Sequence, residues 1–153
     1  MIRIGDILDK ISDYYPDAEL EIVNRAYVYS AQVHEGQVRL SGEPYLSHPL
    51  EVADILADMH LDTTSIACGL LHDVVEDTHT TIEDIQERFG EDAAKIIAGV
   101  TKISKLSLDT ARARQAENLR RMILAMADDL RVILIKLADR LHNIRTLHFH
   151  KSE

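Results

Sequence analysis

The sequence is poor in the residues that cross-link or interrupt a chain. It holds one cysteine, three prolines, six glycines and no tryptophan in 153 residues. A single cysteine cannot form an internal disulfide, which excludes a disulfide-stapled secreted scaffold and favours a reducing, cytoplasmic setting. No linker, internal repeat or low-complexity segment is visible, so we expect residues 1–153 to form one domain.

Long apolar runs and an excess of positive charge are also missing. The longest strongly apolar run in the C-terminal part, 132–135, is broken by Lys136, and the N-terminus lacks the hydrophobic core of a signal peptide. These features predict no membrane segment. The 17 Lys and Arg residues against 26 Asp and Glu give a net charge of −9. This balance argues against general binding of nucleic acid.

Apolar residues recur at helical spacing along the whole chain, and no alternating strand pattern competes with them. Pro49 fits a first helical position, with His48 at or near the N-cap, and Thr81 with Asp84 predicts a capping box. The last helix is apolar around almost its full circumference, which predicts a central, buried helix. We therefore expect an all-α domain, a bundle of about eight helices, near residues 4–11, 20–31, 49–59, 63–77, 82–89, 93–100, 110–126 and 130–148.

The stretch LLHDVVED, residues 70–77, is the most informative motif. On a continuous helix, its polar residues share one face, one turn apart. Gly69 falls in the middle of this face, where a missing side chain would leave room for an ion or a substrate. A solvated surface helix would usually add a Lys or Arg, and this face has none. Three carboxylates without a cation indicate a metal site; the polar residues are His72, Asp73, Glu76 and Asp77.

Asp139 lies in the predicted buried helix, with Asn143 and Thr146 on the same stripe at i+4 and i+7. A buried carboxylate is costly unless it is paired or bound to a cation, so we favour a functional role for Asp139 over a surface ion pair. His48 alone is more often a helix cap or a packed ring than a ligand. For His142 we expect packing or surface exposure.

Together these residues predict more than any of them does alone. Two histidines and two aspartates from three helices would form a site with two nitrogen and two oxygen ligands, His48, His72, Asp73 and Asp139. Such a set suits Mn, Fe, Zn or Ni without choosing among them. Glu76 and Asp77, one turn beyond, could position a water molecule and carry protons.

The motifs resemble the HD-domain metal-dependent phosphohydrolases. More narrowly, they are similar to the N-terminal hydrolase domain of the Rel/Spo (RelA/SpoT) family, the bifunctional (p)ppGpp synthetase/hydrolases of the stringent response. The resemblance rests on five blocks in family order: GQVRLSGEPYLSHPLEVA (36–53), GLLHDVVEDT (69–78), ERFG (87–90) with GVTKISKL (99–106), ENLRRMILAM (117–126) and VILIKLADRLHNIRTL (132–147).

This resemblance implies one metal ion, normally Mn²⁺, on the two histidines and two aspartates named above. It implies that Glu76 and Asp77 activate a water molecule, which attacks the 3′-diphosphate of ppGpp or pppGpp and releases pyrophosphate with GDP or GTP. For Tyr45 we expect a packing role, and Leu40 stands where the family often has Lys. The residues implied for guanosine binding are Arg39, Ser41, Asn143 and Thr146.

Two alternatives stay open beside this hydrolase. One is an HD-type phosphohydrolase of another nucleotide, and the other is a silent module that binds a nucleotide without cleaving it. Larger members of the family continue into a synthetase domain. We therefore expect that the chain is an excised domain of such a protein or a short stand-alone hydrolase, with a small-molecule substrate as its partner.

Overall fold

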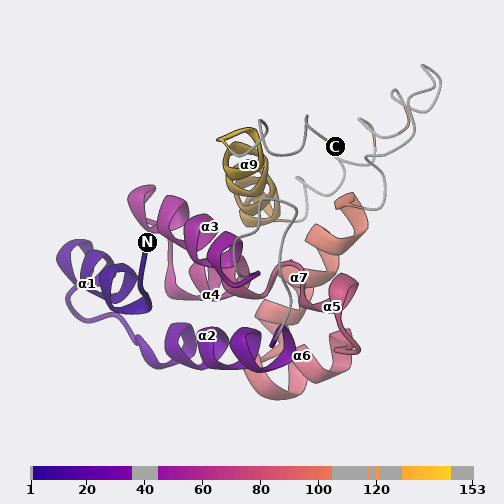
Figure 1. The fold of residues 1–153 in the computed structure, drawn as a ribbon, viewed down its shortest axis with the longest axis horizontal. Helices are drawn as coiled ribbons and strands as arrows, with labels where there is room; N and C mark the ends of the chain where they lie inside the picture. Colours follow the sequence, from indigo (N-terminus) through magenta and orange to yellow (C-terminus); the bar gives the residue numbers. More distant parts are fainter. Residues whose placement is uncertain (1, 36–44, 105–116, 118–119, 121–128, 146–153) are drawn as a thin grey trace.

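The computed structural model describes residues 2–35, 45–104, 117, 120 and 129–145 (Figure 1). These described residues contain helices and no strand, which confirms the all-α prediction. Eight helices have defined bounds within them. They are α1 (Ile4–Tyr14), α2 (Glu21–Val33), α3 (Ser47–Asp58), α4 (Thr63–Leu71), α5 (Val74–Asp77), α6 (Ile82–Phe89), α7 (Glu91–Ser104) and α9 (Leu130–Arg145).

The central helix is α4, which packs against α2, α3, α7 and α9. Every residue of α4 from Ser65 to Leu71 is buried. This segment is almost entirely apolar, so it can be covered on all sides without leaving a charge unpaired. Because α4 lies in the middle, the residues that follow its last turn are delivered to the interior of the bundle.

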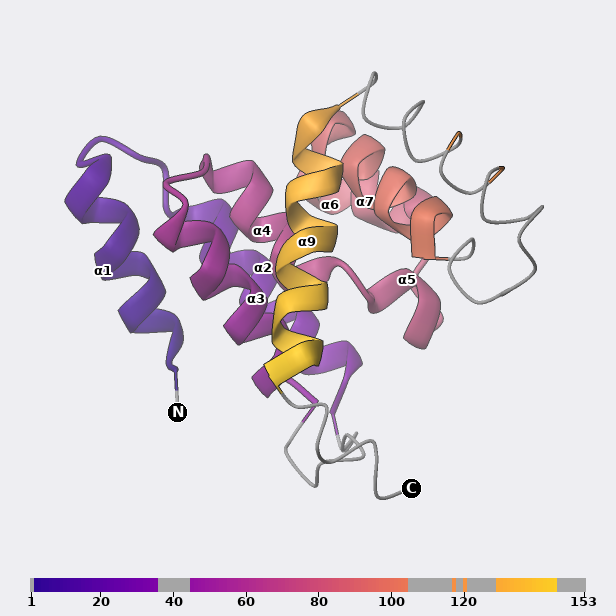
Figure 2. The same ribbon diagram turned by 90° about the horizontal axis from the view of Figure 1, so that it is seen from above.

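The prediction that the helix near 130–148 is central and buried on all sides is wrong. Helix α9 lies across α3, α4 and α7 and contacts them through one face (Figure 2). That face buries Val132, Ile135 and Ala138. Only the side turned toward the bundle is covered, so the large apolar residues on the other side stay exposed: Leu130, Leu137, Leu141 and Ile144.

Gly69 brings α3 and α4 close together. A Cβ atom at this position would lie 2.7 Å from Cδ1 of Leu56 and 3.6 Å from Cα of Ala53. The expectation that Gly69 leaves room for an ion or substrate is therefore wrong, since the space is filled by α3. The missing side chain instead allows the last turn of α4 to sit against α3.

Local signals at the helix ends are mostly as predicted. Thr81 and Asp84 form the capping box that starts α6, and Gly90, with φ of 98°, ends it. Helix α3, however, begins at Ser47, so Pro49 is its third residue and His48 its second. The prediction of Pro49 at the first position is thus wrong by two residues. A proline is tolerated there because the first-turn N–H groups have no partner within the helix.

The motif of residues 70–77 does not lie on one continuous helix. Helix α4 ends at Leu71, and α5 begins at Val74 after a two-residue turn. The turn comes from Asp73, whose φ of −103° and ψ of −2° depart from helical values. The continuous-helix prediction is wrong at this point, and the break separates His72 and Asp73 from the single turn that carries Glu76 and Asp77.

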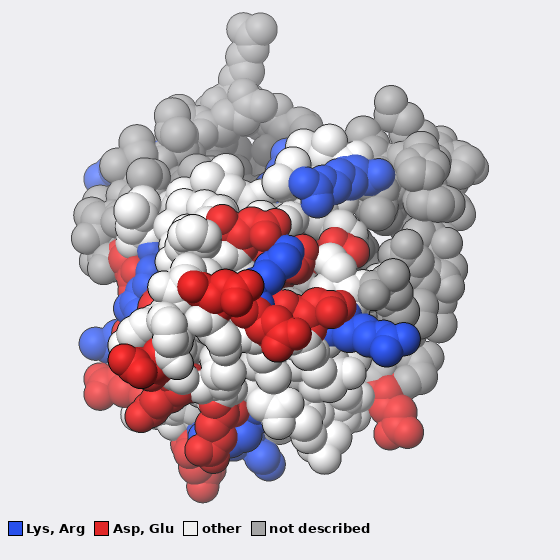
Figure 3. Space-filling model, turned by 90° about the vertical axis from the view of Figure 1, so that its left-hand side faces the viewer, with Lys and Arg blue, Asp and Glu red and all other residues white. Residues whose placement is uncertain are grey.

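Ion pairs link the helices at the surface. Lys10 of α1 pairs with Asp54 and Asp58 of α3, and on the α1 side carboxylates gather around lysine and arginine side chains (Figure 3). Arg131 of α9 pairs with three carboxylates, those of Asp62, Asp92 and Asp129. Within the described part of the chain, no helix is long and apolar enough to cross a membrane.

Candidate metal centre

Three parts of the fold bring the four predicted ligands together. His48 comes from the first turn of α3, Asp139 from the middle of α9, and the other two from the turn between α4 and α5. One nitrogen or oxygen from each of these residues lies within 4.8 Å of the others. We call this group the His/Asp cluster; its members are His48, His72, Asp73 and Asp139.

The distances within the His/Asp cluster show that its nitrogen and oxygen atoms converge on one position. Oδ1 of Asp139 lies 2.7 Å from Nε2 of His48 and 3.4 Å from Nε2 of His72. Oδ2 of Asp73 lies 3.0 Å from Nε2 of His72 and 3.9 Å from Nε2 of His48. Both imidazoles thus present the same nitrogen to the two carboxylates, which is the arrangement that a common cation requires.

Neighbouring groups hold the outward atoms of the ligands. Nδ1 of His72 donates to the backbone carbonyl of Gly69 at 2.6 Å. Nδ1 of His48 lies 2.5 Å from Nδ1 of His142, and the two rings stack. Nζ of Lys136 donates to Oδ2 of Asp139 at 3.0 Å. Outer partners of this kind fix the orientation of metal-ligating side chains.

The buried Nε2 of His72 supports a metal at this position. Among the described residues it has no hydrogen-bond partner, although Oδ2 of Asp73 is only 3.0 Å away. A buried polar atom without a partner is costly. Because Nδ1 of His72 already donates to Gly69, Nε2 is the nitrogen left to bind a cation. The donor chemistry and this unpartnered nitrogen both fit a divalent metal.

The ligands also interact as acids and bases. Burial alone would lower the pKa of His72, but the charges of Asp73 and Asp139 raise it well above its usual value. Burial opposes ionisation of Asp73, yet the neighbouring charge of His72 lowers its pKa to about 2. Burial likewise opposes ionisation of Asp139, and the hydrogen bond from His48 together with the charges of His72 and Lys136 lowers its pKa despite that. The carboxylates therefore stay ionised and hold positive charge beside them.

Glu76 and Asp77 lie at the exposed rim of the His/Asp cluster, on α5. We call these two residues the acid pair. Partial burial, followed by the charges of Asp73 and Asp77, raises the pKa of Glu76. Lys136 acts in the opposite direction, as does a hydrogen bond with Ser104. Glu76 is thus a carboxyl group whose proton affinity is set by both the ligands and the nearby cation.

Tyr45 makes contacts that the sequence did not reveal. Its hydroxyl donates to Asp73 at 3.2 Å and also contacts Oδ2 of Asp77. Its ring stacks on His34, with ring centroids 4.0 Å apart. The expected packing role describes only the ring, since the hydroxyl joins a member of the His/Asp cluster to a member of the acid pair.

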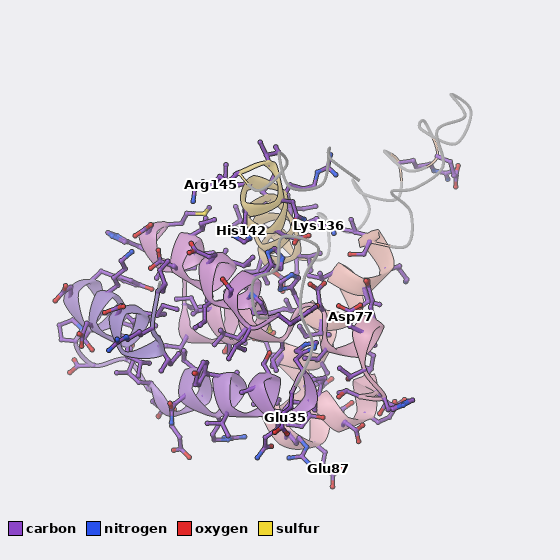
Figure 4. The ribbon with its side chains drawn as sticks, viewed as in Figure 1. Glu35, Asp77, Glu87, Lys136, His142 and Arg145 are labelled. Carbon is purple, nitrogen blue, oxygen red and sulfur yellow. The ribbon has the colours of Figure 1, made fainter. Side chains whose placement is uncertain are left out.

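His142 was the second residue that sequence reasoning missed. It is buried against His48, whereas the sequence suggested packing or surface exposure without a role at the site. In Figure 4, His142 and Lys136 are labelled on α9, and Asp77 on α5. Position 142 lies three residues after Asp139, so i+3 spacing from a ligand is the signal that could have found it.

Of the residues implied for guanosine binding, only Asn143 is among the described residues. Its Nδ2 donates to Oδ1 of Asp139 at 3.3 Å, which agrees with the predicted shared stripe of α9. Arg39, Leu40 and Ser41 lie outside the described residues, and so does Thr146.

Comparison with known proteins agrees with this fold. A family model for the HD domain matches residues 26–153, and the chain belongs to that family. Within the family its relatives are RelA/SpoT proteins. A GTP pyrophosphokinase of Myxococcus xanthus is 58% identical over 146 residues, which cover 94% of this chain and 19% of that protein. The bifunctional (p)ppGpp synthase/hydrolase SpoT of Escherichia coli K12 is 50% identical over 137 residues, covering 90% of this chain and 20% of SpoT.

A solved structure matches the fold. It belongs to a metazoan ortholog of SpoT that hydrolyses ppGpp and plays a role in starvation responses. The TM-score is 0.65 at 34% identity, and the match covers 83% of this chain and 70% of that one. By contrast, the chain spans only about a fifth of the length of the curated relatives described above.

Proposed function

We propose that this chain is a (p)ppGpp 3′-pyrophosphohydrolase domain of the stringent response. It would convert ppGpp or pppGpp to GDP or GTP and release pyrophosphate, with one Mn²⁺ as its metal. The observation that carries the proposal is that the short helix α5 joins the His/Asp cluster, through Asp73 before its first residue, to the acid pair at its last two residues. The names of the relatives, which include a (p)ppGpp hydrolase and a ppGpp-hydrolysing structure, support the same substrate.

The His/Asp cluster would hold the metal through two imidazole nitrogens and two carboxylate oxygens. A divalent cation bound there supplies Lewis acidity, which lowers the pKa of water and stabilises charge on a phosphoryl group. The residue types fit several transition metals. The assignment to Mn²⁺ rests on the family resemblance, and the metal content of the purified protein tests it.

The acid pair would handle the attacking water. Glu76, whose pKa is raised by partial burial and by the charges of Asp73 and Asp77, is suited to take a proton from that water. A new bond forms between the water oxygen and the phosphorus attached to the ribose 3′-oxygen, and the bond from this phosphorus to the 3′-oxygen breaks. The departing 3′-oxygen takes up a proton, for which Asp77, one residue away, is the second carrier on the same turn.

The substrate would lie beside α9. Asn143 sits next to Asp139, so a nucleoside held by its amide would have its 3′-diphosphate close to the His/Asp cluster. We propose that Arg39, Ser41 and Thr146 complete the guanosine site. Leu40 can cover one face of the base but adds no charge where the family often has Lys.

The test is incubation of the purified protein with ppGpp and Mn²⁺, following GDP and pyrophosphate. A panel of other nucleotides distinguishes an HD-type enzyme of different specificity. Glu76→Gln and Asp77→Asn are expected to abolish hydrolysis while leaving ppGpp binding intact, since neither residue is proposed to bind the metal or the guanosine. The silent-module alternative is correct under one outcome. In that outcome the wild-type protein carries metal, wild type and both variants bind ppGpp equally well, and none of the three proteins hydrolyses it.

The setting of the domain is a separate proposal. Because its relatives are about five times longer, we propose that a synthetase domain accompanies this domain in the full-length protein. A cytoplasmic location is proposed as well, because a lone cysteine is typical of proteins in a reducing compartment. Reading the gene on both sides of this segment tests the first proposal, and fractionation of cells tests the second.

A further inference from the structure

Tyr45 stands where three parts of the fold meet. It lies just before α3, and its backbone carbonyl accepts a hydrogen bond from the backbone N–H of His48 at 3.2 Å. Its ring stacks on His34 at the end of α2. Its hydroxyl reaches Asp73 and Asp77 at the two ends of the α5 segment. One residue thus connects the start of α3 and the end of α2 to both carboxylates.

Helix α5 needs such a connection because it is only four residues long. A single helical turn is not stable by itself, since its few hydrogen bonds do not offset the cost of ordering the backbone. The backbone N–H of Asp77 donates to the carbonyl of Asp73 at 2.9 Å, which holds the turn together but leaves the side chains free to rotate. The Tyr45 hydroxyl is the described contact that links those two side chains to each other.

The chemistry of the phenol suits this position. A tyrosine hydroxyl carries one hydrogen, so it donates to one carboxylate at a time and is shared between the two. Burial and the adjacent carboxylates of Asp73 and Asp77 raise the pKa of Tyr45, which keeps the phenol protonated at neutral pH. Without that hydrogen, two negative charges would face each other with no donor between them.

We propose that Tyr45 is a positioning residue of this centre, whose hydroxyl holds Asp77 at a fixed place relative to Asp73. The proposal rests on the proposed function, in which Asp73 is a ligand and Asp77 handles water. The oxygen of Asp73 that receives the hydroxyl is Oδ2, the same oxygen that faces His72 at 3.0 Å. Movement of the phenol would therefore disturb the metal ligand and the water-handling group together.

The variant Tyr45→Phe tests this role, because it keeps the ring that stacks on His34 and removes only the hydroxyl. The chain offers a matched control in Tyr14, whose ring also stacks on a histidine, His60, at 4.5 Å between centroids. The Tyr14 hydroxyl also donates a hydrogen bond, to the carbonyl of Leu61 at 2.6 Å. Tyr14→Phe therefore makes the same chemical change in α1, outside the His/Asp cluster.

Four quantities are measured for each protein: the thermal midpoint, the Mn²⁺ dissociation constant by calorimetry, and kcat and KM for ppGpp. Loss of an outer partner typically costs 10- to 100-fold in metal affinity or activity. For Tyr45→Phe we expect kcat to fall by about 10-fold or more, with KM changed much less. For Tyr14→Phe we expect a lower thermal midpoint with kcat and Mn²⁺ affinity unchanged.

The proposal is overturned if Tyr45→Phe keeps kcat within about 2-fold of wild type, since the ring would then be sufficient. It is also overturned if Tyr14→Phe loses kcat to the same extent, because the effect would then reflect general stability. If the wild-type protein does not cleave ppGpp at all, the proposed function fails separately. In that case Mn²⁺ affinity tests the positioning role. A loss of several-fold in Tyr45→Phe but not in Tyr14→Phe supports this role, and equal affinities of Tyr45→Phe and wild type reject it.

Discussion

Nδ1 of His48 and Nδ1 of His142 lie 2.5 Å apart in the interior of the protein. Two ring nitrogens at this distance share one hydrogen, so one ring donates and the other accepts. With Nδ1 of His48 engaged in this way, its Nε2 is directed at Oδ1 of Asp139 at 2.7 Å. His142 therefore orients a proposed metal ligand without contacting the proposed metal itself.

The first prediction concerns this pair. His142→Phe keeps the ring that stacks on His48 and removes the nitrogen that holds it, so we expect Mn²⁺ affinity to fall by about 10- to 100-fold. His79→Phe, at an exposed position, serves as the control and should bind Mn²⁺ like wild type. Calorimetric titration measures both, and equal affinity of His142→Phe and wild type would show that the histidine pair does not orient the ligand.

The second prediction concerns Lys136. Its ammonium donates to Asp139 and to Ser104 at 2.9 Å, and its charge lowers the pKa of Glu76. In Lys136→Met the carboxyl group of Glu76 is harder to ionise, so the acidic limb of the kcat profile should move to higher pH. We also expect a fall in kcat of roughly 10-fold at the optimum, because Asp139 loses an outer partner.

Lys95→Met is the matched control for this change. Lys95 forms an exposed pair with Glu91 on α7, so its removal should alter neither the pH profile nor kcat. The kcat profiles of wild type and the two variants are compared from acidic to alkaline pH, so that the whole acidic limb is recorded. An unshifted acidic limb in Lys136→Met would contradict the role assigned to its charge.

The third prediction is a pH dependence of the metal-free protein. His72 has a folded-state pKa raised above the usual value of about 6.5. Its contribution to stability is therefore complete below about pH 6.5 and is lost as pH rises through the folded-state pKa. With EDTA present, the thermal midpoint should fall between neutral and alkaline pH, as His72 loses the proton that the charges of Asp73 and Asp139 stabilise.

Added Mn²⁺ should reverse this trend, because a cation replaces the proton and binds more tightly as the imidazoles lose theirs. The measurement is a thermal scan at several pH values with and without metal. A thermal midpoint in EDTA that rises steadily with pH above 7 would contradict the sign of the effect. Binding of Mn²⁺ near neutral pH should also release protons, which calorimetry in buffers of different ionisation enthalpy detects.

The sequence predicted which residues form the His/Asp cluster better than it predicted the local backbone around them. The four members of the His/Asp cluster could be named because their residue types and spacings are unusual in apolar helices. The turn at Asp73 could not be predicted, since the apolar pattern of residues 70–77 is compatible both with one continuous helix and with two helices separated by a turn. The contacts of Tyr45 and His142 depend on helices far apart in the sequence, and only the fold shows which side chains meet there.

For the fold, too, the sequence predicted local features better than the packing of the helices. Helix existence follows from local periodicity and caps, as at Thr81 and Asp84. Which helix is central depends on how the helices pack. The sequence predicted that the helix near 130–148 is central, whereas α4 occupies that position in the structure. A run such as 132–135 is apolar on all sides, yet packing covers only the side that faces α3 and α7. Periodicity alone could not distinguish the two outcomes.

The fourth prediction follows from the role of Gly69. In Gly69→Ala the new methyl group would lie 2.7 Å from Cδ1 of Leu56, which is fully buried and has little space to move. Overpacking of a core costs about 1–3 kcal/mol, and the better helix propensity of Ala offsets about 1 kcal/mol of it. We expect a net loss of about 1 kcal/mol in the free energy of unfolding, measured by urea titration.

Gly5→Ala is the matched control, because no atom lies within 4 Å of a Cβ atom at this position in α1. We expect a stabilisation of up to about 1 kcal/mol there. Opposite signs for the two substitutions support close packing of α3 on α4 through Gly69. A stabilised Gly69→Ala would mean that the space beside this residue is not filled.

The central claim is that one divalent ion on His48, His72, Asp73 and Asp139 makes this chain a ppGpp hydrolase. It is tested most directly by titrating metal-free protein with Mn²⁺ and measuring the rate of pyrophosphate release from ppGpp. We predict no release without metal, a rate that rises until about one ion per chain is bound, and no release at any Mn²⁺ concentration by Asp139→Asn. Release that is independent of metal, or no release by metal-loaded wild-type protein, would contradict the account.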